Sequence, residues 1–285
     1  MLHLANAELT VDLLDPAAEH ARLGPRFCWG GYIWQVHDKD VGALLTGPEW
    51  PSPTPLPHNG QGLPESFRHS TTEGKPLLWD GPVGLAPGAG ILGRDASGAV
   101  VVTQPCVWEI DQQQPGRFVF RTEQSVGRWA YALERTIELR GRQLVSRSRL
   151  VNRGPAALEL AWFAHPFFAL QADGKLRAAL AADTSLADNP GYSLAGGELT
   201  FRRAFQGVDD GHLVHLGLPA GQPFATTLSH PRLASVRFAT DFAPFKCVLW
   251  ANGNTLSFEP FLALNLAPGE AREWMVTYEF GKVLD

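Results

Sequence analysis

Apolar and polar residues alternate with a period of two along much of the chain, which predicts β-strands. The pattern is clearest over 131–139 and resumes over 143–151, and only Gly141-Arg142 separates the two segments. Such a pair between two alternating runs is typical of a tight hairpin turn. Shorter strand-like segments occur at 7–13, 26–36, 100–103, 117–122, 201–218, 226–228, 236–238, 246–250 and 273–280. We therefore expect an all-β chain of antiparallel strands.

The segment 158–170, LELAWFAHPFFAL, predicts a strand that ends at a titratable histidine. Its even positions from Leu158 to Ala164 alternate with odd positions that end at His165. Pro166 lacks a backbone donor, so the strand is expected to end there, with His165 at its rim as the last residue of the third strand of a meander. A histidine among aromatics can donate or accept a proton near neutral pH. The alternative is a half-buried histidine hydrogen-bonded to a backbone carbonyl, which is the commoner case for a lone histidine.

Turn-forming residues and the supply of apolar side chains favour one large β domain. The chain has 285 residues, of which 45% are hydrophobic, and its 29 glycines and 22 prolines are spread without a fixed period. Sixteen phenylalanines and nine tryptophans are ample for a core. We expect a single domain over 1–285. A Pro- and Gly-rich segment at 47–64 predicts a long loop on the surface or across the mouth of a site.

The charge and the cysteines of the chain restrict the partners and the cellular compartment that we expect for it. The net charge is −5, and no cluster of lysine and arginine predicts a nucleic-acid surface. The amino terminus lacks a basic, apolar leader and no run of 18 apolar residues occurs, so we expect a cytoplasmic protein without a membrane partner. Cys28, Cys106 and Cys247 are far apart and odd in number, which favours buried, reduced thiols over disulfides or a catalytic cysteine.

Two further places carry candidate chemistry. Glu65, Arg68 and His69 follow the long loop and lie beside Phe67, a combination that suits a sugar or a small anion. The alternative is a solvated loop end with a surface ion pair. Glu259 stands between two phenylalanines in the run FEPF, where desolvation would raise its pKa and let it act as a general acid or base. Its alternative is a rim glutamate in a surface ion pair.

No pattern in the sequence predicts a metal or a cofactor. His212 and His215 belong to a strand-like segment, where residues three apart point to opposite faces. The chain has neither an HExxH nor a CxxC motif. We expect no catalytic metal and no cofactor.

Three segments, in order, resemble the galactose mutarotase-like family, which contains aldose 1-epimerases and related hexose mutarotases. They read YALERTIELRGRQLVSRSRLVNRGPAALELAWFAHPFF, then GVDDGHLVHL, then NTLSFEPFLALNLAPGEAREWMVTYEF, and cover most of residues 100–280. The resemblance implies a large antiparallel β-sandwich, or supersandwich, with a substrate cleft. It also implies that His165 protonates the sugar ring oxygen and that Glu259 removes the anomeric hydroxyl proton. Asp209 matches the sugar-binding aspartate, with Asp210 as the alternative.

The sequence departs from this family in its first third. Typical members have a second histidine in an L-H-G-G or H-G-F-A-R segment, and here His58 and His69 are the nearest candidates. Arg68 and Glu65 could stand in as sugar contacts. If the sugar bears a phosphate or sulfonate, Arg68 and Arg26 are the basic residues to consider.

Three functions therefore remain open from the sequence. The first is an aldose 1-epimerase that acts on a monosaccharide or modified sugar as a monomer or homodimer. The second is a non-catalytic carbohydrate-binding protein, and the third is another carbohydrate-active enzyme on the same fold.

Overall fold

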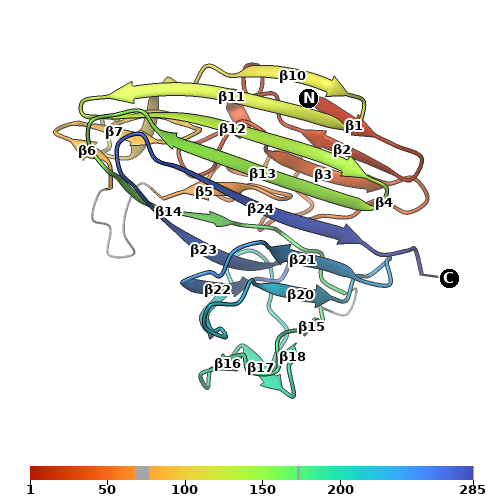
Figure 1. Cartoon of the computed structure of the whole chain (residues 1–285). Helices are drawn as coiled ribbons and strands as arrows, with labels where there is room; N and C mark the ends of the chain where they lie inside the picture. The colour runs from red at the N-terminus through yellow and green to blue at the C-terminus, as the bar shows by residue number, and fades with distance from the viewer. Residues whose placement is uncertain (69–76, 172–173, 285) are drawn as a thin grey trace.

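The computed structural model describes residues 1–68, 77–171 and 174–284 (Figure 1). In these ranges the chain forms antiparallel sheets joined by turns and loops, and η1 (His20–Arg22) is a single turn of 3-10 helix. No helix in these ranges has the length and apolar character needed to cross a membrane. The expected all-β class is confirmed.

The largest sheet has ten strands and forms one layer of the sandwich (Figure 1). Its order is β10 (Glu109–Gln114), β11 (Arg117–Val126), β12 (Trp129–Arg140), β13 (Gln143–Asn152), β24 (Ala271–Phe280), β21 (Val236–Thr240), β20 (Ala225–Leu228), β15 (Arg177–Ala179), β18 (Glu198–Phe201) and β17 (Tyr192–Ala195). Arg140 pairs with Gln143, so Gly141-Arg142 is the two-residue hairpin turn that the sequence predicts. Gly141 adopts a φ of +54°, which suits glycine in such a turn.

The second layer is a six-stranded sheet, which carries the candidate site. Its order is β16 (Ser185–Leu186), β19 (His212–Gly217), β22 (Lys246–Ala251), β23 (Leu256–Leu266), β14 (Leu158–Ala164) and β5 (Glu65–Phe67). The strand predicted at 158–164 is confirmed, and it ends immediately before His165 and Pro166.

The expectation that this strand is the third of a meander is wrong. β13 pairs with β24, whereas β14 crosses to the other sheet and pairs with β23 and β5. Alternation gives the faces of a strand but carries no information about its neighbours, which are chosen by long-range packing. The turn at 152–157 therefore connects two layers of the sandwich.

Two four-stranded sheets complete the fold (Figure 1). One contains β1 (Leu2–Ala5), β2 (Leu9–Leu13), β3 (Ile33–Asp38) and β4 (Gly42–Ala43), and the other contains β6 (Trp79–Asp80), β7 (Val83–Ala86), β8 (Gly90–Arg94) and β9 (Val100–Pro105).

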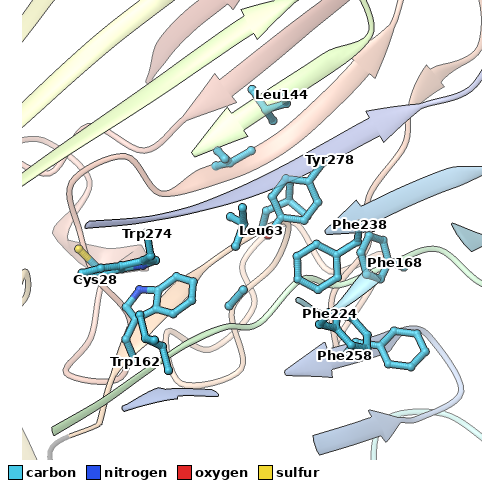
Figure 2. Close-up of a cluster of buried hydrophobic side chains, with 14 of the residues drawn as sticks. Cys28, Leu63, Leu144, Trp162, Phe168, Phe224, Phe238, Phe258, Trp274 and Tyr278 are labelled. Carbon is cyan, nitrogen blue, oxygen red and sulfur yellow. The ribbon is translucent and has the colours of Figure 1, made fainter. Parts of the chain in front are cut away.

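Aromatic side chains from both layers meet in the core between the two large sheets (Figure 2). Trp162 of β14 lies 5.4 Å from Trp274 of β24 between ring centroids, and both are buried. Phe238 and Tyr278 stack at 5.0 Å in the same core. Each such side chain contributes on the order of 2–3 kcal/mol through burial alone. The core thus fixes one face of β14 and leaves its other face for the site.

Candidate active site

A cavity of about 1020 Å³ lies on the face of the six-stranded sheet that points away from the core. The register explains its floor: His215 of β19 pairs with Val248 of β22, and Val248 pairs with Glu259 of β23. All three line the cavity, whereas their neighbours Leu249 and Phe258 pack into the core. The strand alternation therefore assigns these side chains to the cavity.

His165 enters the cavity directly after the last residue of β14. Its backbone N–H donates to the carbonyl of Pro64 at 2.9 Å, which anchors the bend before Pro166. The imidazole is 2% exposed, so it is buried rather than placed at a rim. Its Nδ1 lies 3.0 Å from Ser257 Oγ, and its Nε2 lies 3.0 Å from Arg26 Nη2 and 3.3 Å from Glu259 Oε1.

Burial sets the protonation of the two candidate catalytic groups. It lowers the pKa of His165 well below its usual range, and the charge of Arg26 acts in the same direction. Burial also raises the pKa of Glu259 to about 7, although Arg26 and Lys246 oppose that rise. Glu259 is 7% exposed, in agreement with the prediction of a desolvated carboxyl and not with a surface ion pair. Phe261 shares the cavity face with Glu259, but Phe258 lies in the core.

Arg26 joins this pair from the loop before β3. Its Nη1 donates to the carbonyl of His58 at 2.7 Å, and its own carbonyl accepts a hydrogen bond from Ser66 Oγ at 2.6 Å. Its guanidinium also covers the ring of Phe27 at 5.0 Å. From the sequence Arg26 is expected only as a contact for an anionic sugar, because nothing local links it to a histidine 139 residues away.

The structure separates Asp209 from Asp210. Asp210 accepts hydrogen bonds from Arg203 at 2.6 Å and from the backbone of Gln206, and these contacts lower its pKa to about 2. Asp209 is exposed and lines the cavity. Of the two, Asp209 is the one that lines the cavity.

The candidate residues that follow the long loop lie in two different environments. Arg68 lines the cavity, as does His58 from the loop itself. Glu65 is 2% exposed and forms an ion pair with Arg135 at 2.6 Å. It does not line the cavity, which differs from the expectation that it contacts a sugar. His69 lies outside the described residues. The sequence contains a sign of this ion pair. Arg135 lies on the apolar face of the strand at 131–139, and a buried guanidinium requires a counter-charge.

Sequence reasoning missed His215 and Trp250 as cavity residues. His215 lines the cavity, whereas His212 packs against Tyr192 on the opposite face of β19, at 5.7 Å between ring centroids. The opposed orientation of the two histidines was therefore predicted correctly. Within the described residues no group of three or more His, Cys, Asp or Glu side chains is arranged to hold a metal ion.

The three cysteines are buried and unpaired, as expected. Burial raises the pKa of Cys28 to about 12 and that of Cys106 to about 11. Burial also raises the pKa of Cys247 well above its usual value. None of them is suited to act as a thiolate nucleophile at neutral pH.

Comparisons with solved structures identify the fold. A galactose mutarotase-like protein from Lactobacillus casei ATCC 334 superposes with a TM-score of 0.64 at 16% identity, covering 98% of this chain and 99% of that one. A galactose mutarotase related enzyme from Lactobacillus acidophilus gives 0.63 at 13% identity, over 100% and 98%. A candidate aldose 1-epimerase from Escherichia coli K12 gives 0.58 at 13% identity, over 98% of both chains.

The chain therefore has the galactose mutarotase-like β-sandwich fold, as the resemblance in its sequence implied. No protein-family model and no curated protein sequence matches the chain.

Proposed function

We propose that this protein is an aldose 1-epimerase that interconverts the α and β anomers of a hexose or a modified hexose. The observation that carries this proposal is the close approach of His165 Nε2 and Glu259 Oε1, at 3.3 Å, on the floor of one large cavity. The fold shared with mutarotase-like proteins supports it.

Anomer exchange needs only the movement of two protons. A base removes the proton of the anomeric hydroxyl, the C1–O5 bond breaks, and O5 takes a proton from an acid. Rotation about C1–C2 and the reverse steps form the other anomer. The anomeric hydroxyl oxygen, O1, and the ring oxygen, O5, are both bonded to C1. An acid and a base 3.3 Å apart are therefore suitably spaced to serve both oxygens.

Other cavity residues would hold the sugar. Asp209 and Arg68 offer hydrogen bonds to hydroxyl groups, and Trp250 and Phe261 offer faces for the apolar C–H side of a pyranose. His58 is our candidate for the second histidine expected from the resemblance, because its pKa is lowered by burial and by Arg26, which favours a neutral imidazole beside the ligand.

Exchange spectroscopy by NMR between the α and β signals of a panel of hexoses tests the proposal. We expect the wild-type protein to accelerate exchange over buffer for at least one sugar, and His165→Ala and Glu259→Gln to lose that acceleration. No acceleration with any sugar, or full activity in His165→Ala, would overturn it.

Calorimetric binding and product analysis with the same sugars separate the other two functions. A sugar that binds in calorimetry without faster exchange would favour the non-catalytic carbohydrate-binding protein. A product other than an anomer would favour another carbohydrate-active enzyme.

A further inference from the structure

Ser257 binds the nitrogen of the His165 imidazole that does not meet Glu259. Its Oγ lies 3.0 Å from Nδ1 of the ring, whereas Glu259 Oε1 lies 3.3 Å from Nε2. Ser257 and His165 are both buried. A hydrogen bond between two buried side chains is shielded from water, so it constrains the ring more strongly than a surface contact would.

The strand register explains why Ser257 reaches the histidine but not the cavity. Ser257, Glu259 and Phe261 occupy alternate positions of β23, so their side chains share one face of the six-stranded sheet. Glu259 and Phe261 line the cavity, whereas Ser257 does not. A ligand in the cavity would contact Glu259 itself, but Ser257 can act on that ligand only through His165.

Aromatic packing alone does not fix which way the imidazole points. The ring lies among three aromatic side chains, Phe167 at 4.6 Å, Phe163 at 5.8 Å and Phe27 at 5.9 Å between centroids. A half-turn about the Cβ–Cγ bond exchanges Nδ1 with Cδ2 and Nε2 with Cε1, and it hardly alters the shape of the ring. Apolar neighbours therefore accept both orientations, and polar contacts must choose between them.

The polar contacts select the orientation that places Nε2 in the cavity. In the half-turned ring a C–H group would face Ser257 Oγ, and Nε2 would be withdrawn from Glu259 Oε1 and from Arg26 Nη2, which lies 3.0 Å away. Arg26 and Glu259 line the cavity, so a ligand can displace their contacts with Nε2. The contact at Nδ1 is the one that a bound ligand leaves in place.

A hydroxyl suits this place because the charge of the ring changes during proton transfer. Ser257 Oγ can accept a hydrogen bond from a protonated Nδ1 and can donate one to an unprotonated Nδ1. The bond is therefore compatible with the imidazolium and with both neutral forms of His165. It orients the ring without setting the direction in which Nε2 moves a proton.

We propose that Ser257 is a positioning residue that holds the imidazole of His165 with Nε2 in the cavity while a sugar is bound. The hydrogen bond is a property of the free protein. Its effect on turnover rests on the proposed epimerase function, with His165 in the acid role that the resemblance implies. Ser257→Ala should therefore keep the cavity and lose the fixed orientation of its histidine.

Nitrogen NMR of the protein labelled with ¹⁵N-histidine tests the contact without any substrate. The His165 signals are assigned by their loss in His165→Asn. We expect Ser257→Ala to shift the Nδ1 signal of His165 by several ppm, and Ser257→Thr, which keeps a hydroxyl, to lie closer to wild type. An unchanged Nδ1 signal in a folded Ser257→Ala protein would overturn the proposal.

Ser148→Ala is the matched control for the loss of a buried hydroxyl. Ser148 is buried on β13 of the other large sheet, and its Oγ accepts a hydrogen bond from Arg135 Nε at 3.2 Å. It does not line the cavity. Both alanine variants should lower the free energy of unfolding, but only Ser257→Ala should move the signals of His165.

Anomer exchange provides the second readout, as kcat and KM for a sugar that the wild type converts. We expect Ser257→Ala to lower kcat by about tenfold and to change KM by less than about twofold, because the serine does not contact the sugar. Ser257→Thr should recover most of kcat, and Ser148→Ala should match the wild type.

Two results would refute the positioning role. One is a kcat within about twofold of wild type in Ser257→Ala, and the other is an equal loss of kcat in Ser148→Ala. If Ser257→Thr does not fold, the comparison of the two alanine variants still decides. If the wild-type protein accelerates no exchange, the proposed function fails, while the ¹⁵N measurement still decides whether Ser257 holds His165.

Discussion

Glu259 is the residue whose burial both suits it to proton transfer and lowers the stability of the folded protein. Its pKa is raised to about 7 from a usual value of 4.5 because the group is buried. When a carboxyl has a raised pKa in the folded protein, the free energy of unfolding falls as the pH rises, since the carboxyl ionises more easily in the unfolded chain. The cost is absent below pH 4.5, grows between pH 4.5 and 7, and is fully present above pH 7.

Replacement of Glu259 by glutamine should therefore stabilise the protein at alkaline pH. We expect Glu259→Gln to raise the free energy of unfolding by about 2–3 kcal/mol at pH 8.5, and by almost nothing at pH 4.5. Urea unfolding at the two pH values measures the difference. An equal effect at both values would show that ionisation of Glu259 is not its cause.

At the level of the element, β14 divides its side chains between two environments. Its even-numbered residues, including Trp162, face the core, and its odd-numbered residues lead through Phe163 to His165 in the cavity. The sequence predicted this division, because a period of two is a local property. It could not predict that β14 pairs with β23, and so it could not bring His165 to Glu259.

Loss of Trp162 should be felt in stability. Its ring contacts Trp274 at 5.4 Å and Phe242 at 5.8 Å, and it is fully buried. We expect Trp162→Ala to lower the free energy of unfolding by about 3–5 kcal/mol, and Trp162→Phe by a smaller amount. Chemical denaturation checks this order, and a loss below 1 kcal/mol in Trp162→Ala would contradict the described core.

The ion pair of Glu65 and Arg135 joins β5 of the six-stranded sheet to β12 of the ten-stranded sheet. Arg135 also donates to the carbonyl of Gly30 at 2.6 Å and to Ser146 Oγ at 2.9 Å. We expect Arg135→Met to cost about 3–5 kcal/mol, because it leaves the buried Glu65 carboxylate without its counter-charge, with Ser146 Oγ as its hydrogen-bond donor.

The double variant Glu65→Gln, Arg135→Met should recover part of that loss in urea unfolding. If the double variant is as unstable as Arg135→Met alone, the uncompensated charge is not the reason. Sugar affinity should be unchanged in folded Glu65→Gln, since Glu65 does not line the cavity.

For the whole molecule, the pattern and composition predicted the all-β class and the order of motifs predicted the fold. Of the candidate site residues, His165, Glu259, Asp209 and Arg68 meet in one cavity, although they come from distant parts of the chain. The contact of Arg26 with His165 could not be predicted, because it depends on a loop whose path is fixed only by tertiary hydrogen bonds. Glu65 is expected at the site from the sequence, because its true partner, Arg135 on β12, is 70 residues away and the local sequence around Glu65 gives no sign of the pairing.

The single domain over 1–285 remains a prediction for the whole chain. A shared core between the two large sheets implies that they unfold together. We expect one calorimetric transition, coincident with the loss of tryptophan fluorescence and of circular dichroism. Two separated transitions would indicate two independent units.

The pH dependence of anomer exchange tests the His165 and Glu259 pair most directly. The active form holds one proton between them, so exchange should fall as the pair loses that proton, about tenfold for each pH unit above about 7. The measurement is the exchange rate by NMR from pH 5 to 9, corrected for buffer, with wild type and Glu259→Gln side by side. We predict this alkaline fall in the wild type and no protein-catalysed exchange in the variant. A rate that is flat across pH 7, or the same profile in Glu259→Gln, would contradict the role of the pair.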